Sequence, residues 1–184
     1  MSQACKFIKG HLHSPYFIFV RASGRLSDED LLKLLGLGDC VSCPLRVDWS
    51  TPHLYLTEDD TWIHIADDWR YSLWHKGRNQ LVDELHKSIP DTPIFACSVG
   101  DSDWSFSFAY YSSDRLLRRH VVEDPHYDRG RRIVVEDFGQ PFPSEMALSD
   151  IDDEQDYVLS LAASLGVKLN HQPGSIRCYT KPSL

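Results

Sequence analysis

The alternation of apolar and polar positions along this chain predicts short strands joined by turns. It is clearest from Trp104 to Tyr111, where aromatic side chains alternate with serine and alanine. Successive side chains of a strand point to opposite faces, so we expect this aromatic row to face the core. The same reasoning predicts further strands over residues 16–22, 54–57, 61–66, 93–99, 115–123 and 175–180.

Three segments carry the signals of helices. Ser27 can cap a helix whose first turn is acidic, and Gly36 ends it. Residues 71–89 have apolar side chains at helical spacing, and Pro90 stops them. A last helix is expected over 149–166. The elements together predict an α+β fold, a mainly antiparallel sheet built from hairpins with two or three packed helices.

The tetrapeptide Val-Val-Glu-Asp occurs twice, at 121–124 and 134–137, on either side of a turn-rich segment. This pattern predicts a β-hairpin, and we expect Val122 to lie opposite Val134. That register brings acids and bases together as Asp124 with Arg132, His120 with Glu136, and Arg119 with Asp137. The alternative hypothesis is a carboxylate cluster that binds a cation or a basic partner.

Composition indicates one globular domain over 1–184, because 42% of the residues are hydrophobic and can form one core. We expect residues 1–14 to form an irregular segment at its start. We expect a cytoplasmic protein without a membrane segment, since no run approaches the ~20 apolar residues that cross a bilayer. The 5 cysteines are an odd number without regular spacing, which favours reduced thiols.

The net charge of −8 disfavours nucleic acid as a partner and favours a basic protein. Six arginines nevertheless gather between residues 115 and 132, close to the repeated acids. We expect them to pair with acids inside the molecule.

One candidate for chemistry lies where a predicted strand meets a predicted helix. Asp67 and Asp68, with Trp69, Trp74 and His75 nearby, could form a pocket with a general acid or base. The catalytic candidates are Asp67, Asp68 and His75. The structural alternative is that Asp68 caps the helix and the indoles pack in the core, and we favour it.

Two further motifs have simpler interpretations. The run from Gly100 to Trp104 includes Asp101 and Asp103 but lacks the later glutamate of a calcium loop, so it predicts a turn. Cys40 and Cys43 have the spacing of a zinc or redox pair, but a zinc site needs further ligands, and neither His53 nor His64 fits a standard spacing. We therefore expect neither a metal nor a cofactor.

The segment 95–145 resembles uncharacterised bacterial proteins without an assigned activity. The resemblance rests on Ser-Val-Gly-Asp-Ser-Asp at 98–103, the Phe-Ala-Tyr-Tyr strand, the Val-Val-Glu-Asp pair and Phe-Gly-Gln-Pro at 138–141. It implies no catalytic residue. In class, though not in motif, the chain also resembles small acidic bacterial immunity proteins.

Three hypotheses for function follow. The first is a non-enzymatic binding module, an immunity or regulatory protein, that engages a basic protein through acidic and aromatic residues. Its proposed surface consists of Asp67, Asp68, Trp69, Trp74, Asp101, Asp103 and Trp104. The second is a small hydrolase or transferase with the carboxylates and His75 at its centre, and whether the chain is an enzyme stays open. The third is a homodimer formed through an edge of the sheet.

Overall fold

The computed structural model describes residues 16–22, 24–45, 53–67, 80–100, 103–148, 150–168 and 175–182. Its strands are β1 (Tyr16–Val20), β2 (Val41–Cys43), β3 (Leu54–Glu58), β4 (Ile63–Asp67), β5 (Ile94–Val99), β6 (Phe106–Tyr111), β7 (Leu116–Glu123), β8 (Ile133–Phe138) and β9 (Arg177–Thr180). Its helices are α1 (Asp28–Leu34), α2 (Gln80–Ser88), α3 (Pro143–Ala147), α4 (Glu154–Ser164) and the 3₁₀ turn η1 (Arg129–Arg131).

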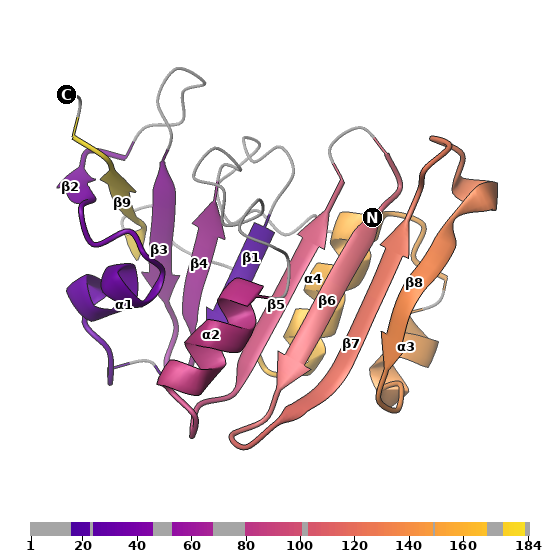
Figure 1. The fold of residues 1–184 in the computed structure, drawn as a ribbon, viewed down its shortest axis with the longest axis horizontal. Coiled ribbons are helices and arrows are strands. Elements are labelled where there is room, and N and C mark those ends of the chain that lie inside the picture. The colour runs from indigo at the N-terminus through magenta and orange to yellow at the C-terminus, as the bar shows by residue number, and fades with distance from the viewer. Residues whose placement is uncertain are drawn as a thin grey trace.

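The strands form one nine-stranded sheet in the order β2-β9-β3-β4-β1-β5-β6-β7-β8. Each neighbouring pair runs antiparallel, and hairpins join β3 to β4, β5 to β6, β6 to β7 and β7 to β8. Figure 1 shows β2 and β8 at the two ends of the sheet. The predicted α+β class and antiparallel hairpins are therefore confirmed.

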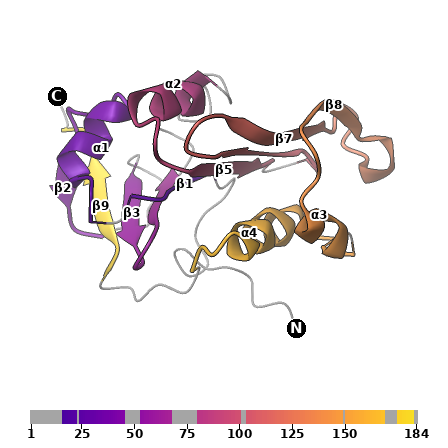
Figure 2. The same ribbon diagram turned by 90° about the horizontal axis from the view of Figure 1, so that it is seen from below.

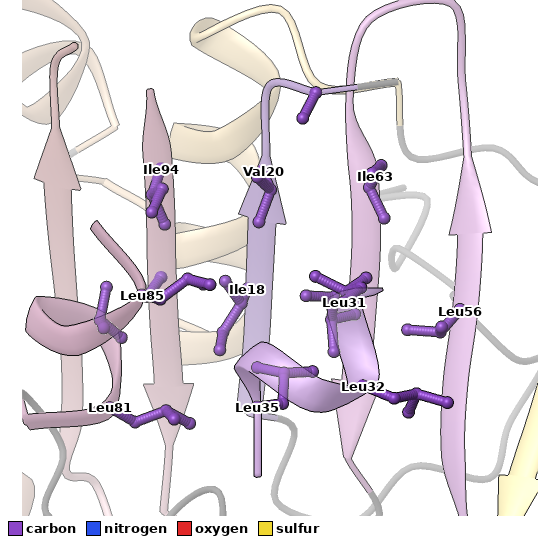
Figure 3. Packing of buried hydrophobic residues seen from close by; sticks show 14 of the residues in the cluster. Ile18, Val20, Leu31, Leu32, Leu35, Leu56, Ile63, Leu81, Leu85 and Ile94 are labelled. Atoms are coloured by element: carbon purple, nitrogen blue, oxygen red, sulfur yellow. The ribbon is translucent and has the colours of Figure 1, made fainter. Parts of the chain in front are cut away.

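Helices cover both faces of the sheet, as Figure 2 shows, with α1 and α2 on one side and α3 and α4 on the other. Under α1 and α2 the core is aliphatic, and Leu31 and Leu35 pack over Ile18 and Leu56 (Figure 3). Under α4 it is aromatic, and the rings of Phe95 and Phe108 stack with centroids 6.1 Å apart. Both faces of the central strands are buried in consequence, which explains why β5 is buried along its whole length.

Two helices differ from the sequence prediction. The last helix begins at Glu154, because the side chain of Asp153 accepts a hydrogen bond from the amide of Asp156 at 2.8 Å and caps it there. The short α3 was not predicted. It begins at Pro143, and proline suits the first turn of a helix because the amides there have no helical partner. Of the predicted helix over 71–89, the structure describes only residues from Gln80 onward, in α2.

None of the helices in the described ranges combines the length and the apolar character needed to cross a bilayer.

Asp59 closes the β3–β4 hairpin and ties it to the chain after α4. Its carboxylate accepts hydrogen bonds from the amides of Thr61 at 2.7 Å, Trp62 at 2.8 Å and Lys168 at 3.0 Å. Burial acts to raise the pKa of Asp59, but the three amides and the imidazole of His64 together lower it below the ordinary value. The folded state therefore favours the ionised form of the Asp59 carboxylate.

We expect the free energy of unfolding to fall as pH falls from about 4 towards the lowered pKa of Asp59. The sign follows because the folded pKa lies below the unfolded one, so the unfolded chain takes up the proton first. In Asp59→Asn, urea unfolding at stepped pH should show a smaller decline than in the wild type. Asp60→Asn is the control, because the Asp60 side chain is 85% exposed, and an Asp59→Asn decline equal to that of the wild type would contradict the prediction.

Candidate functional site

The β7–β8 hairpin carries both Val-Val-Glu-Asp segments, and its register is shifted by a bulge. Val122 lies opposite Val134 as predicted, but the register changes between Val121 and Val122, where β8 contains the additional residue Val135. Residues beyond the bulge therefore meet different neighbours than an unbroken ladder would give. His120 lies opposite Asp137, and Arg119 lies opposite Phe138.

The predicted pairing of acids and bases across this hairpin was accordingly wrong in its details. Asp137 binds the side chains of Arg118 and His120, and the His120 Nδ1 lies 3.2 Å from its carboxylate. The hydrogen bond from Arg118, and then that from His120, lowers the pKa of Asp137 below its ordinary value. The Asp124 carboxylate accepts hydrogen bonds from the backbone amides of Asp128 and Trp104, at 2.8 and 3.3 Å, while the Arg132 side chain donates to Glu154 at 2.9 Å.

Arg118 fixes one face of the hairpin to α3. Its guanidinium is only 2% exposed and donates to the two carboxylate oxygens of Glu145 at 2.9 and 2.8 Å. It also donates to the carbonyl oxygen of Phe138 at 3.0 Å. Glu145 in turn accepts a hydrogen bond from the amide of Phe142 at 2.7 Å, at the start of α3. One buried ion pair thus joins β7, the end of β8 and α3.

Arg119 fixes the opposite face of the hairpin to α2. Consecutive residues of a strand point to opposite sides, so its guanidinium lies on the face away from that of Arg118. It donates to Asp83 at 2.9 Å and to the hydroxyl of Tyr111, and it lies 3.5 Å from Glu136. The Tyr111 hydroxyl donates to Asp83. Burial, and next the hydrogen bond with Asp83, raises the pKa of Tyr111.

A surface hollow lies at the other end of the hairpin, beside η1. A cavity of about 360 Å³ is lined by Val99, Gly100, Asp103, Trp104, Asp153, Glu154 and Gln155. The guanidinium of Arg129 covers the ring of Trp104, 4.3 Å from its centroid. Glu154 accepts hydrogen bonds at 2.9 Å from both Arg129 and Arg132. Two guanidiniums neutralise this carboxylate, which suits a structural role better than proton transfer.

The outer side of β8 is the long open edge of the sheet. Within the described ranges, no strand pairs with that side (Figure 1), whereas the opposite edge strand β2 has only 3 residues. Four apolar residues of β8 are about half exposed, with fractions of 48% for Ile133, 57% for Val134, 48% for Val135 and 50% for Phe138. Natural edge strands are usually short or carry charged side chains, proline or a bulge, because an open edge can pair with another chain. β8 has a bulge at Val135 and the acids Glu136 and Asp137, but it has neither lysine nor proline.

Most of the residues predicted to form a site lie outside the described part of the chain. Asp67 ends β4, but its side chain lies outside the described part of the chain, as do Asp68, Trp69, Trp74, His75 and Asp101. Asp103 accepts hydrogen bonds from the amide, at 2.9 Å, and the hydroxyl of Ser105, which agrees with the predicted turn. Trp104 is 42% exposed and so does not join the aromatic row in the core.

The open edge was not predicted from the sequence, although one signal for it was present. Residues 133–138 contain 4 apolar side chains among 6, and the two-proline segment that follows cannot continue a sheet. This pattern indicates the last strand of a sequence of hairpins. It cannot show which sides of that strand are covered.

Side chains suited to a metal lie elsewhere among the described residues, near the opposite edge of the sheet. Cys40 and Cys43 do not act as a pair there, because Cys40 packs against the aliphatic core and Cys43 against the aromatic core. The sulfur of Cys43 lies 3.4 Å from that of Cys178 instead.

Comparisons of the chain with protein-family models, with curated proteins and with solved structures gave no match.

Proposed function

We propose that the protein is a non-enzymatic binding module that takes up an extended segment of a protein partner along the open side of β8. The observation that carries this proposal is the exposure of four apolar side chains on an edge strand that neither lysine nor proline protects. In such a complex the partner adds a strand to the sheet. Backbone hydrogen bonds supply affinity, and the exposed side chains of the edge select the sequence.

The charge of the chain favours a basic partner. The net charge is −8, and the Asp137 side chain on β8 is 56% exposed although it contacts Arg118. The Asp152 side chain, beside η1, is fully exposed. A partner segment that alternates apolar and basic residues would match this edge, and electrostatic attraction would speed its association. An immunity or regulatory protein acts in this way, by occupying its partner.

A homodimer through β8 is the competing occupant. Pairing of two copies would bring together two chains of net charge −8 and two copies of Glu136 and Asp137. Like charges brought together in this way oppose association, which favours a partner of the opposite charge.

The test compares one substitution at the two edges of the sheet. Val135 on β8 and Val41 on β2 are both 48% exposed, so Val135→Lys and Val41→Lys add the same charge at equal exposure. We expect the wild type and Val41→Lys to retain the same basic protein from a lysate of the source cells at low salt. Val135→Lys should retain at least about tenfold less, since an unfavourable group at an interface costs 1.4 kcal/mol or more.

The retained protein is then purified and titrated calorimetrically against all three chains. Equal affinity for Val135→Lys and the wild type would contradict the proposal. Size-exclusion chromatography with light scattering tests the competing occupant. A wild-type mass of two chains that Val135→Lys reduces to one would replace the proposal with the homodimer.

A further inference from the structure

Two thiols and an imidazole meet near the edge of the sheet opposite to β8. Cys43 is the last residue of β2, Cys178 lies in β9, and His53 immediately precedes β3. Their ligand atoms all lie within 4.8 Å of one another. The two sulfurs are 3.4 Å apart although 135 residues separate them in the sequence.

Strand pairing places these side chains on one face of the sheet. Cys43 lies opposite Cys178, and Cys178 lies opposite Tyr55 on β3, so these three side chains point the same way. His53 is two residues before Tyr55, which is the spacing that keeps side chains of an extended chain on one face. The ring of His53 stacks on that of Tyr55, with centroids 6.1 Å apart and planes inclined by 28°. The backbone of three strands therefore holds the cluster in place.

The chemistry of these groups points to a transition metal. Thiolate and imidazole are ligands that zinc prefers, whereas magnesium and calcium take oxygen ligands. In a tetrahedral site with Zn–S bonds of ~2.3 Å, the two sulfurs are about 3.8 Å apart. The observed separation of the two sulfurs is 3.4 Å, and a small rotation of the cysteine side chains would bring it to the tetrahedral value. His53 and Cys178 are 3% and 2% exposed, so a metal here would be largely shielded from water.

We propose that Cys43, His53 and Cys178 bind a zinc ion. Binding forms two Zn–S bonds and one Zn–N bond, and the protons of the two thiols leave to solvent. Three protein ligands leave the fourth tetrahedral position to water or a small ligand, as in other sites with two cysteines and one histidine. The ion would tie together β2, β9 and the start of β3, which are short strands of 3, 4 and 5 residues. This proposal is independent of the β8 surface.

The test uses the full chain, purified in a reducing buffer, freed of metal by a chelator and titrated with Co²⁺ and then Zn²⁺. Cobalt bound by thiolates gives a sulfur-to-metal charge-transfer band, and its visible bands become intense when the site is tetrahedral. We expect one equivalent of cobalt to bind with both signatures and zinc to displace it. Zinc should also raise the midpoint of thermal unfolding, because the three ligands are brought together in the folded chain.

Cys43→Ser is the principal variant, because Cys43 is only partly buried on an edge strand and its loss should leave the fold intact. We expect it to abolish the charge-transfer band or weaken metal affinity by at least about 100-fold, since removing even an outer-shell partner costs about 10–100-fold. Cys40→Ser is the control. It removes a partly buried thiol from the aliphatic side of the sheet and should bind metal like the wild type.

Either of two results would overturn the proposal. One is a folded, reduced wild-type chain that binds no stoichiometric cobalt or zinc, and this result needs no variant. The other is Cys43→Ser with the wild-type affinity and spectrum.

Discussion

Replacing Arg118 with methionine is expected to lower the free energy of unfolding by about 3–5 kcal/mol, the usual cost of removing one partner from a buried ion pair. Its guanidinium is 2% exposed, and the Glu145 carboxylate that it binds is 9% exposed. Methionine fills much of the same space but cannot donate a hydrogen bond. Glu145 would be left as a buried charge, with the amide of Phe142 as its remaining hydrogen-bond donor among the residues that the structure describes.

Urea denaturation measures this effect, and Arg115→Met is its matched control. Arg115 is exposed at the turn before β7, so the same substitution there should change stability by less than about 0.5 kcal/mol. In the double variant Arg118→Met/Glu145→Gln we expect part of the loss to be recovered, because a neutral amide is less costly to bury than a carboxylate. A loss at Arg118 no larger than that at Arg115 would show that the ion pair contributes little.

Replacing Gly139 with alanine is the second large expected effect, a loss of more than about 2 kcal/mol. Gly139 follows β8 with a φ of +81°, and left-handed backbone alone costs about 1–2 kcal/mol for a residue with a Cβ. The added Cβ would also overlap the carbonyl oxygen of Leu117 on β7. Backbone atoms cannot rotate away as a side chain can, so the end of the hairpin would have to move.

Gly166→Ala separates the two causes of this loss. Gly166 has a φ of +90°, but an added Cβ would meet nothing within 4 Å. We expect it to lose only the conformational part, about 1–2 kcal/mol. Thermal unfolding of both variants gives the comparison, and equal losses would mean that the approach to Leu117 carries no cost.

Both substitutions act on the same part of the molecule as the proposed binding surface. Arg118 and Gly139 hold the end of β8 against β7 and α3. An edge strand that is held rigidly loses little conformational freedom when a partner segment binds, which favours affinity. A milder variant of this cluster, Glu145→Gln, is therefore useful for asking whether binding depends on how firmly β8 is held.

The β7–β8 hairpin shows how much of the fold the local sequence pattern predicted. Two Val-Val pairs around a turn predicted both strands and the contact of Val122 with Val134, because β propensity and turn chemistry are properties of nearby residues. The bulge at Val135 was not predicted. Nor were the partners of the two arginines on β7, because Arg119 binds Asp83 of α2 and Arg118 binds Glu145 of α3, which lie outside the hairpin.

The proposed zinc ligands, Cys43, His53 and Cys178, show more clearly what a local sequence pattern cannot predict. Metal-binding motifs are read from short spacings, and by that criterion Cys40 and Cys43 were paired and His53 was set aside. In the fold, β9 inserts between β2 and β3 and brings Cys178 to the other two ligands. No local pattern encodes the insertion of a C-terminal strand between two earlier ones.

The sequence by itself determined the class and most of the elements, though not β2, α3 or the start of α4: alternation indicated the strands, capping residues and prolines indicated helix ends, and the order of hairpins indicated an antiparallel α+β fold. Only the tertiary structure decided which strand lies at an edge, which carboxylates meet which arginines, and which thiols meet an imidazole. The physical reason is the distance along the chain over which each interaction acts. Propensity, capping and turn chemistry act within a few residues, whereas edges, buried ion pairs and metal clusters arise where distant segments pack together.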